Sequence, residues 1–139
     1  MTVTTEVPRI LDASAVVETF SGNRELMTVL EAASDGRLVA VLPIIAMIEA
    51  QAVLAAKASH WDLILALSGV HAVLATEEGV TEIGNLAAPR VRYHPDHRTL
   101  LNPIMTAQVL HEAKMMNGVI MTRVPEAYGG HDVTVHLIN

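Results

Sequence analysis

Short apolar runs and longer helical patterns alternate along the whole chain. Two runs are apolar throughout and short enough to be buried strands: 38–42, which Pro43 closes, and 119–122. Short runs at 9–11 and 70–74 predict two further strands, and the alternation at 133–138 predicts an edge strand. Helical patterns lie between them at 13–20, 25–34, 44–57, 60–67, 77–87 and 103–116. Strands that alternate with helices predict an α/β protein with a mainly parallel sheet, covered by helices on both faces.

The composition indicates one globular domain over residues 1–139. A chain of 139 residues has the usual length of a single domain, and it contains neither a repeat nor a linker-like stretch. The absence of cysteine excludes a disulfide scaffold, a thiolate zinc site and a thiol nucleophile. The hydrophobic content of 51% excludes a disordered chain. The apolar helices at 44–67 offer more surface than a small sheet covers, so we expect a homodimer.

The net charge and the apolar runs limit the location and the partners. A formal charge of −6 gives the whole chain no general attraction to nucleic acid, although a local basic patch can still bind it. The longest apolar run, at 38–48, contains Pro43 and is too short for a membrane span, which needs about 20 residues. The first ten residues lack the pattern of a signal peptide. We therefore expect a cytoplasmic protein that does not enter a membrane.

Asp12 is the first candidate site residue, and Ser14 follows two positions later. Asp12 comes directly after a predicted strand, and ligands of parallel sheets gather at the carboxyl ends of the strands. The alternative is purely structural, because Asp and Ser both cap helices by accepting bonds from free backbone amides.

Glu49 is the second candidate, in the helix predicted at 44–57. Its neighbours three and four positions away are all apolar: Ile45, Ala46, Ala52 and Val53. This places Glu49 on a buried or half-buried face, where a carboxylate needs a cation, a hydrogen-bond donor or a metal. A salt bridge to an arginine is the structural alternative. Together, Asp12 and Glu49 are the kind of oxygen ligands that Mg²⁺ and Mn²⁺ prefer.

Four segments of the chain resemble the motifs of PIN domains, the ribonuclease fold of VapC-like toxins. The run 10–15 (ILDASA) resembles the first motif, and 41–50 (VLPIIAMIEA) resembles the second, with a glutamate on the helix that follows a strand. The runs 106–113 and 118–122 match the third and fourth mainly by spacing. The resemblance implies a three-layer α/β/α fold, catalysis with a divalent metal held by Asp12 and Glu49, and support of that metal site by Ser14 and Thr106.

The chain departs from the family at two of the four acidic positions. Thr106 stands where the third motif has an aspartate, and Arg123 and Val124 stand where the last acid follows the fourth strand. A threonine hydroxyl is a poor substitute ligand, because Mg²⁺ sites depend on negatively charged oxygens. We therefore expect Mg²⁺ or Mn²⁺ to bind weakly or only with phosphate, unless Asp96 or a partner chain supplies another acid.

The segment 90–98 is a basic island in an acidic chain. Arg90, Arg92 and Arg98 are candidates for holding RNA phosphates, with Tyr93 available to stack on a base. The structural alternative is a solvated loop before the next helix.

Two functions remain open from the sequence. The first is a PIN-like binding or regulatory module whose nuclease chemistry is impaired by its incomplete acidic site. The alternative is a Mg²⁺-dependent VapC-like ribonuclease, the toxin of a toxin–antitoxin pair with an antitoxin protein as partner. The sequence does not decide whether the protein is an enzyme.

Overall fold

The computed structural model describes residues 6–93 and 103–139, and in this part of the chain one sheet is formed entirely by parallel strands. Its strands are β1 (Arg9–Leu11), β2 (Ala40–Pro43), β3 (Val70–Val73), β4 (Val119–Thr122) and β5 (Thr134–Leu137). They lie in the order β3-β2-β1-β4-β5. The first strand of the sequence is therefore the central one, and β5 is an edge strand, as the alternation predicts.

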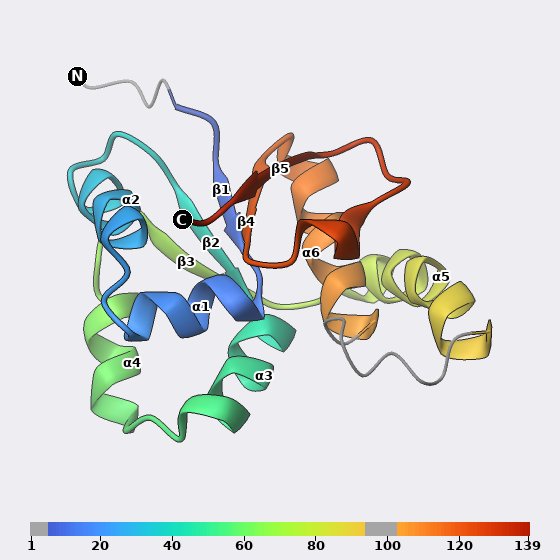
Figure 1. Cartoon of the computed structure of the whole chain (residues 1–139), viewed down its shortest axis with the longest axis horizontal. Helices are drawn as coiled ribbons and strands as arrows, with labels where there is room; N and C mark the ends of the chain where they lie inside the picture. The colour runs from blue at the N-terminus through green and yellow to red at the C-terminus, as the bar shows by residue number, and fades with distance from the viewer. Residues whose placement is uncertain (1–5, 94–102) are drawn as a thin grey trace.

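Helices cover both faces of this sheet, and Figure 1 shows the resulting layers. The helices are α1 (Ala13–Phe20), α2 (Arg24–Ser34), α3 (Ile44–Leu54), α4 (Ala58–Leu65), α5 (Glu77–Tyr93), α6 (Pro103–Met116) and the 3₁₀ helix η1 (Pro125–Tyr128). Helices α1, α2 and α4 pack on one face, α6 packs on the other, and α5 packs against α6. The predicted three-layer α/β/α architecture is confirmed.

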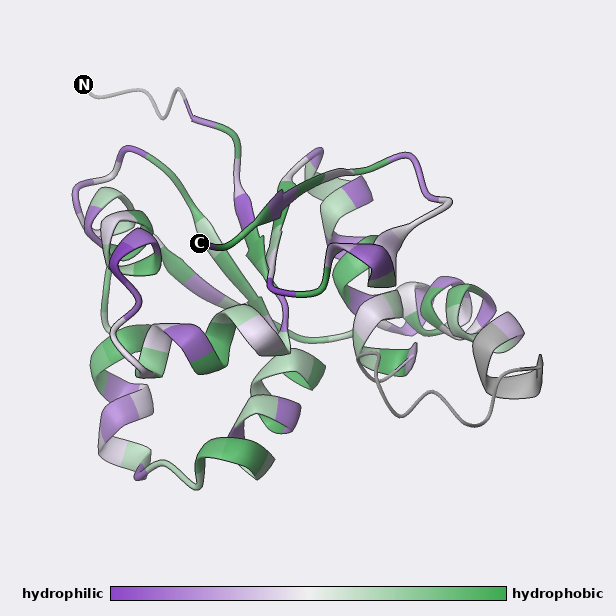
Figure 2. Ribbon diagram, in the orientation of Figure 1, coloured by the Kyte–Doolittle hydropathy of each residue, from purple (hydrophilic) through white to green (hydrophobic). Residues whose placement is uncertain are grey.

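The inner residues of the central strands are apolar because both faces of these strands are buried. On β1, Ile10 faces the core beneath α6, and its neighbour Leu11 faces the core beneath α1 and α2. Ile120 and Met121 on β4 divide between the two cores in the same way. Figure 2 shows the corresponding band of hydrophobic colour through the sheet. Parallel sheets with helices on both faces require such strands.

Some predicted boundaries are wrong, and the structure gives the reasons. Helix α3 ends at Leu54 rather than at residue 57, because Ala55 adopts a left-handed conformation with φ 49°. The helix predicted at 77–87 continues to Tyr93 through Pro89, and its contacts with α6 through Ile83 and Ala87 support it. Proline disfavours a helix interior but does not end a helix that tertiary packing holds.

Gly69 is required by a close approach of two segments. A Cβ atom at this position would lie 2.2 Å from the carbonyl oxygen of Ala33 at the end of α2. The residue marks the end of a helical stretch in the sequence, but its structural role is to let β3 begin against α2.

Among the described residues, no helix is both long and apolar enough to cross a membrane.

Candidate functional site

Asp12 lies at the carboxyl end of the central strand and caps the helix that follows. Its side chain accepts a hydrogen bond from the Ala15 backbone N–H at 3.0 Å, while its own backbone is extended, as at an N-cap. The structural alternative for Asp12, a helix cap, is therefore confirmed.

The carboxylate of Asp12 is completely buried and hydrogen-bonded on both oxygens. Oδ1 also accepts a bond from the Ser14 hydroxyl at 2.6 Å, and Oδ2 accepts one from the Tyr128 hydroxyl at 2.7 Å. The exposed fraction of Asp12 is 0%. Burial raises the pKa of Asp12, against the opposing effect of hydrogen bonds from Ser14, Thr122, Tyr128 and the Ala15 amide.

Ser14 and Thr122 connect this site to the end of β4. The Ser14 hydroxyl accepts a bond from the Arg123 backbone N–H at 2.9 Å, and its oxygen lies 3.3 Å from that of Thr122. Thr122 in turn accepts a bond from the Val124 N–H at 2.9 Å. Ser14 therefore bridges β1 and β4, as a residue that supports Asp12, and the amides beyond β4 are satisfied by hydroxyls.

Tyr128 is a site residue that the sequence did not indicate. The short helix η1 brings it back over the carboxyl end of β1, where it is almost fully buried. Pro125, at the first position of η1, is a local signal for this turn. Nothing in the sequence shows that the tyrosine hydroxyl reaches Asp12, because the two residues are 116 positions apart.

The hydrogen bonds described for Asp12 do not include Glu49 or Thr106. Glu49 lies half-buried on α3, and it is not among the hydrogen-bond partners of Asp12. Thr106 is buried in the first turn of α6, and its hydroxyl donates to the Pro103 carbonyl of its own helix at 3.0 Å. Thr106 therefore bonds within its own helix, whereas Ser14 is joined to Asp12 by a described hydrogen bond.

Gln108 joins the start of α3 to the end of β3 at the same edge of the sheet. The sequence does not predict this role. Gln108 is fully buried, its side-chain oxygen accepts from the Ile45 N–H at 2.9 Å, and its amide nitrogen donates to the Val73 carbonyl at 3.3 Å. The start of α3 has no side-chain cap of its own, so Gln108 satisfies one of its free amides from α6.

The described side chains do not gather into a group of three potential metal ligands. Within residues 6–93 and 103–139, no three histidine, aspartate or glutamate side chains come close enough to hold a metal ion. Asp12, the deepest acid at this edge, has both oxygens engaged by the protein. A hard cation prefers several charged or carbonyl oxygens as ligands.

Most of the basic segment 90–98, which is predicted to contact RNA, lies outside the described residues. The backbones of Arg90 and Arg92 belong to the end of α5, but their side chains, together with Arg98 and Asp96, lie outside the described residues.

Two solved structures show what this fold is similar to. A chain from VapBC2 of Rickettsia felis, bound to a DNA fragment from its promoter, aligns with a TM-score of 0.66 and 13% identity, over 95% of this chain and 99% of that one. A chain from a toxin–antitoxin complex of Klebsiella pneumoniae aligns with a TM-score of 0.59 and 20% identity, over 94% and 98%. No protein-family model and no curated protein sequence matches this chain. The PIN-like α/β/α fold of VapC proteins is thus confirmed for the chain.

Proposed function

We propose that this protein is a toxin-type PIN-like module that binds an antitoxin-type protein and has little or no nuclease activity. The observation that carries the proposal is the state of Asp12, whose two carboxylate oxygens are both bonded by side chains or amides of the protein's own fold. A catalytic metal site needs such oxygens to face a cation. Thr106 adds no charge at the position where the resembling family has an aspartate.

Divalent-cation binding is weak in this proposal, and RNA contact through Arg90, Arg92 and Arg98 stays a prediction. A cytoplasmic location is part of the same proposal. The alternative, a Mg²⁺-dependent ribonuclease, depends on Asp12 leaving its hydrogen bonds and acting with Glu49.

The decisive experiment measures RNA cleavage and Mn²⁺ binding with matched variants. Asp12→Asn keeps an acceptor for the helix cap, Glu49→Gln removes the charge on α3, and Glu31→Gln removes an exposed charge on α2 as the control. We expect no Mg²⁺-dependent cleavage above the Asp12→Asn background and no saturable Mn²⁺ binding by calorimetry below millimolar concentration. Cleavage that Asp12→Asn and Glu49→Gln abolish, but Glu31→Gln preserves, would establish the ribonuclease instead.

The proposal of an antitoxin-type partner is supported by the fold and by the two similar solved structures, which are toxin–antitoxin assemblies. Co-expression with the product of the adjacent reading frame, followed by light scattering, tests it. We expect a complex of defined stoichiometry; separate elution of the two chains at micromolar concentration contradicts the partner assignment.

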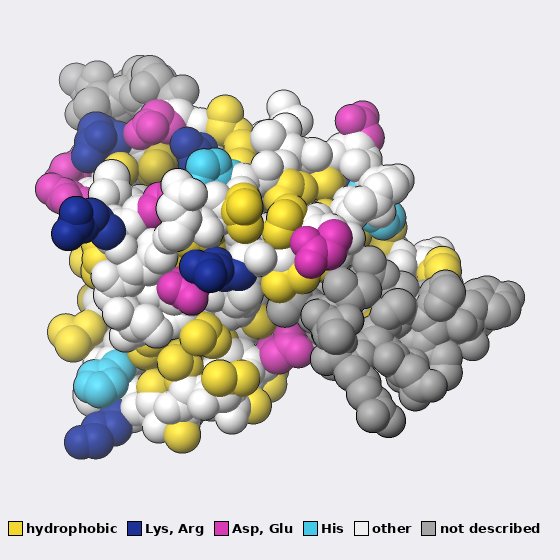
Figure 3. All heavy atoms as spheres, in the orientation of Figure 1, with side chains coloured by type: hydrophobic (Ala, Val, Ile, Leu, Met, Phe, Trp, Pro, Cys, Tyr) yellow, Lys and Arg dark blue, Asp and Glu magenta, His cyan; other side chains and the backbone are white. Residues whose placement is uncertain are grey.

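The homodimer is proposed for the apolar surface over α3 and α4. Ile48 and Val53 on α3 are 63% and 71% exposed, and Leu63 on α4 is 71% exposed. Figure 3 shows hydrophobic side chains gathered in the lower part of the visible face, where these helices lie. Large exposed apolar patches mark interaction surfaces.

Light scattering of Leu63→Glu tests the homodimer. We expect a dimer for the unaltered chain and a monomer for Leu63→Glu. The control is Met115→Glu, which alters an exposed apolar residue on α6 and should leave the dimer intact. An unaltered chain that is monomeric contradicts the homodimer.

A further inference from the structure

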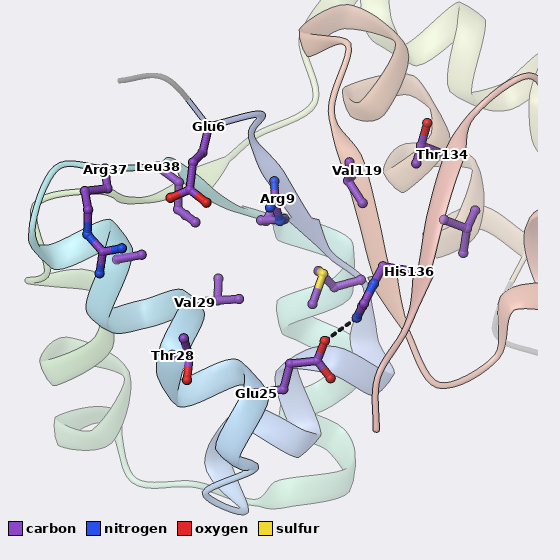
Figure 4. Close-up of a pocket in the computed structure, with 13 residues that line it drawn as sticks. Glu6, Arg9, Glu25, Thr28, Val29, Arg37, Leu38, Val119, Thr134 and His136 are labelled. Atoms are coloured by element: carbon purple, nitrogen blue, oxygen red, sulfur yellow. Dashed lines mark hydrogen bonds and ion pairs between the residues drawn. The ribbon is translucent and has the colours of Figure 1, made fainter. Parts of the chain in front are cut away.

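A cleft of about 520 Å³ lies between α2 and the strands β1, β4 and β5, away from the carboxyl edge that holds Asp12. Figure 4 shows α2 on one side of this cleft and β4 and β5 on the other. Val29 on α2, Leu38 before β2, and Val119 and Met121 on β4 give it an apolar lining. The volume is within the range of small-molecule sites, about 300–1,000 Å³.

Arg9 is the unusual residue of this cleft. It begins the central strand of the sheet, where its neighbours Ile10 and Leu11 are fully buried. Central strands of a parallel sheet are normally apolar on both faces, so a half-buried arginine here departs from the pattern. Figure 4 shows the Arg9 side chain inside the cleft, between Glu6 and Val119.

Among the described residues, the guanidinium of Arg9 has one hydrogen bond and therefore unused donors. It donates to the Val7 carbonyl, a bond to its own local backbone. Within the described part of the chain, the ion pairs do not include Arg9. A guanidinium carries five N–H donors in a planar fork that matches a carboxylate or phosphate, so most of its capacity is left for something in the cleft.

The other charged groups at the cleft are already paired or lie at its mouth. Glu25 on α2 bonds His136 on β5 and also accepts from the Asn139 N–H at 3.0 Å. Arg37 pairs with Asp35 at 3.5 Å, with both side chains more than half exposed, and Glu6 is exposed. Arg9 is therefore the half-buried basic group of the cleft that takes part in none of the described ion pairs.

We propose that this cleft binds a small amphiphilic anion, whose carboxylate or phosphate pairs with Arg9 and whose apolar body lies on Val29, Leu38 and Met121. The site is independent of Asp12 and of the function proposed above. Arg9 supplies bidentate recognition of the anionic group, and the apolar lining supplies the hydrophobic contribution.

The experiment is calorimetric titration with three aromatic probes and one bare anion. Phenyl phosphate and benzoate carry the two candidate head groups, benzyl alcohol is the neutral match, and inorganic phosphate lacks the apolar body. We expect one of the two aromatic anions to bind with a stoichiometry of one, and benzyl alcohol and inorganic phosphate to bind at least about tenfold more weakly. The preferred aromatic anion distinguishes a phosphate ligand from a carboxylate ligand.

Substitutions of Arg9 test whether the anion binds at this residue. Arg9→Gln should weaken binding of the preferred anion by roughly tenfold or more, the size expected for the loss of a charge-assisted pair. Arg9→Lys keeps the charge without the fork and should be intermediate. The control is Arg24→Gln, an exposed arginine at the start of α2 outside the cleft, which should bind like the unaltered protein.

Backbone amide shifts in NMR spectra give a second readout. The preferred anion should move the resonances of Val29, Val119 and Met121, and thermal melts should show that each variant remains folded. Three results would overturn the proposal. Folded Arg9→Gln could bind the anion as tightly as the unaltered protein, or the resonance shifts could lie elsewhere in the protein. The third result is that neither aromatic anion binds up to about 10 mM, a dissociation constant that corresponds to only about 2.7 kcal/mol.

Discussion

Two charged residues flank the apolar pair Ile10–Leu11 of the central strand, and they differ in burial and in hydrogen-bond partners. Asp12, at the carboxyl end, is fully buried, and the fold supplies donors to both of its oxygens. Arg9, at the amino end, is half-buried and bonds only its own local backbone among the described residues. A buried charge whose partners are all internal supports the fold, whereas a charge with unused donors at a cleft is available to a ligand.

The largest expected effect is the loss of Asp12. Asp12→Ala removes the cap of α1, worth about 0.5–2 kcal/mol, and removes the carboxylate that accepts from the Ser14 and Tyr128 hydroxyls, at about 1–3 kcal/mol. We expect the free energy of unfolding in urea to fall by about 2–4 kcal/mol. Asp35→Ala, at an exposed aspartate, is the control and should change it by less than about 0.5 kcal/mol. A fall below about 1 kcal/mol would mean that Asp12 is not the structural centre of this edge.

Removing the hydroxyl of Tyr128 tests the same network more gently. Tyr128→Phe keeps the buried ring and deletes one hydrogen bond to a carboxylate, so we expect a loss of about 1–2 kcal/mol in urea unfolding. Thr28→Val deletes a hydroxyl at an exposed position on α2 and should have almost no effect. Equal effects of the two substitutions would show that the bond to Asp12 contributes little.

Glu25, at the rim of the cleft, makes the stability of the folded protein depend on pH. Burial acts to raise its pKa, but the Asn139 amide and His136 outweigh that effect and lower the pKa below the usual 4.5. A carboxylate with a lowered pKa stabilises the folded state above its unfolded pKa, and this stabilisation is lost as the pH falls through the folded value.

Glu25→Gln should therefore destabilise the protein by a few tenths to about 1 kcal/mol near pH 6, the usual range of a partly exposed pair. The difference should close as the pH falls below about 4.5. Urea unfolding at a series of pH values measures this. The exposed Glu31→Gln serves as the control, and a difference that persists unchanged at pH 3 contradicts the assigned cause.

Replacing Arg9 should have the smallest effect on stability. Arg9→Met keeps an unbranched side chain and removes a charge that has no ion pair in the described part of the chain. We expect the free energy of unfolding to change by less than about 0.5 kcal/mol. A loss above about 1 kcal/mol would show that Arg9 has a structural partner and would remove the contrast with Asp12.

The fold follows from local patterns to a large extent, whereas the site does not. The strands at 9–11 and 119–122 are predicted with the observed bounds, since each is an apolar run between clear breaks. The early end of α3 at Leu54 has no glycine or proline to mark it. The cap function of Asp12 is local and was among the predicted alternatives. The contacts of Tyr128 with Asp12, and of Gln108 with α3 and β3, join distant segments, so only the folded chain reveals them.

The central position of β1 also determines when the sheet can be completed during synthesis. Arg9 is in register with Ala40 on one side and with Val119 on the other. As the chain leaves the ribosome from its N-terminus, β1 and β2 are available to each other early, but the other edge of β1 stays open until β4 has been translated. An unpaired strand edge is a template for pairing with other chains. A nascent chain of this protein therefore has a long interval of exposure to aggregation, and slow translation should make its dependence on chaperones greater.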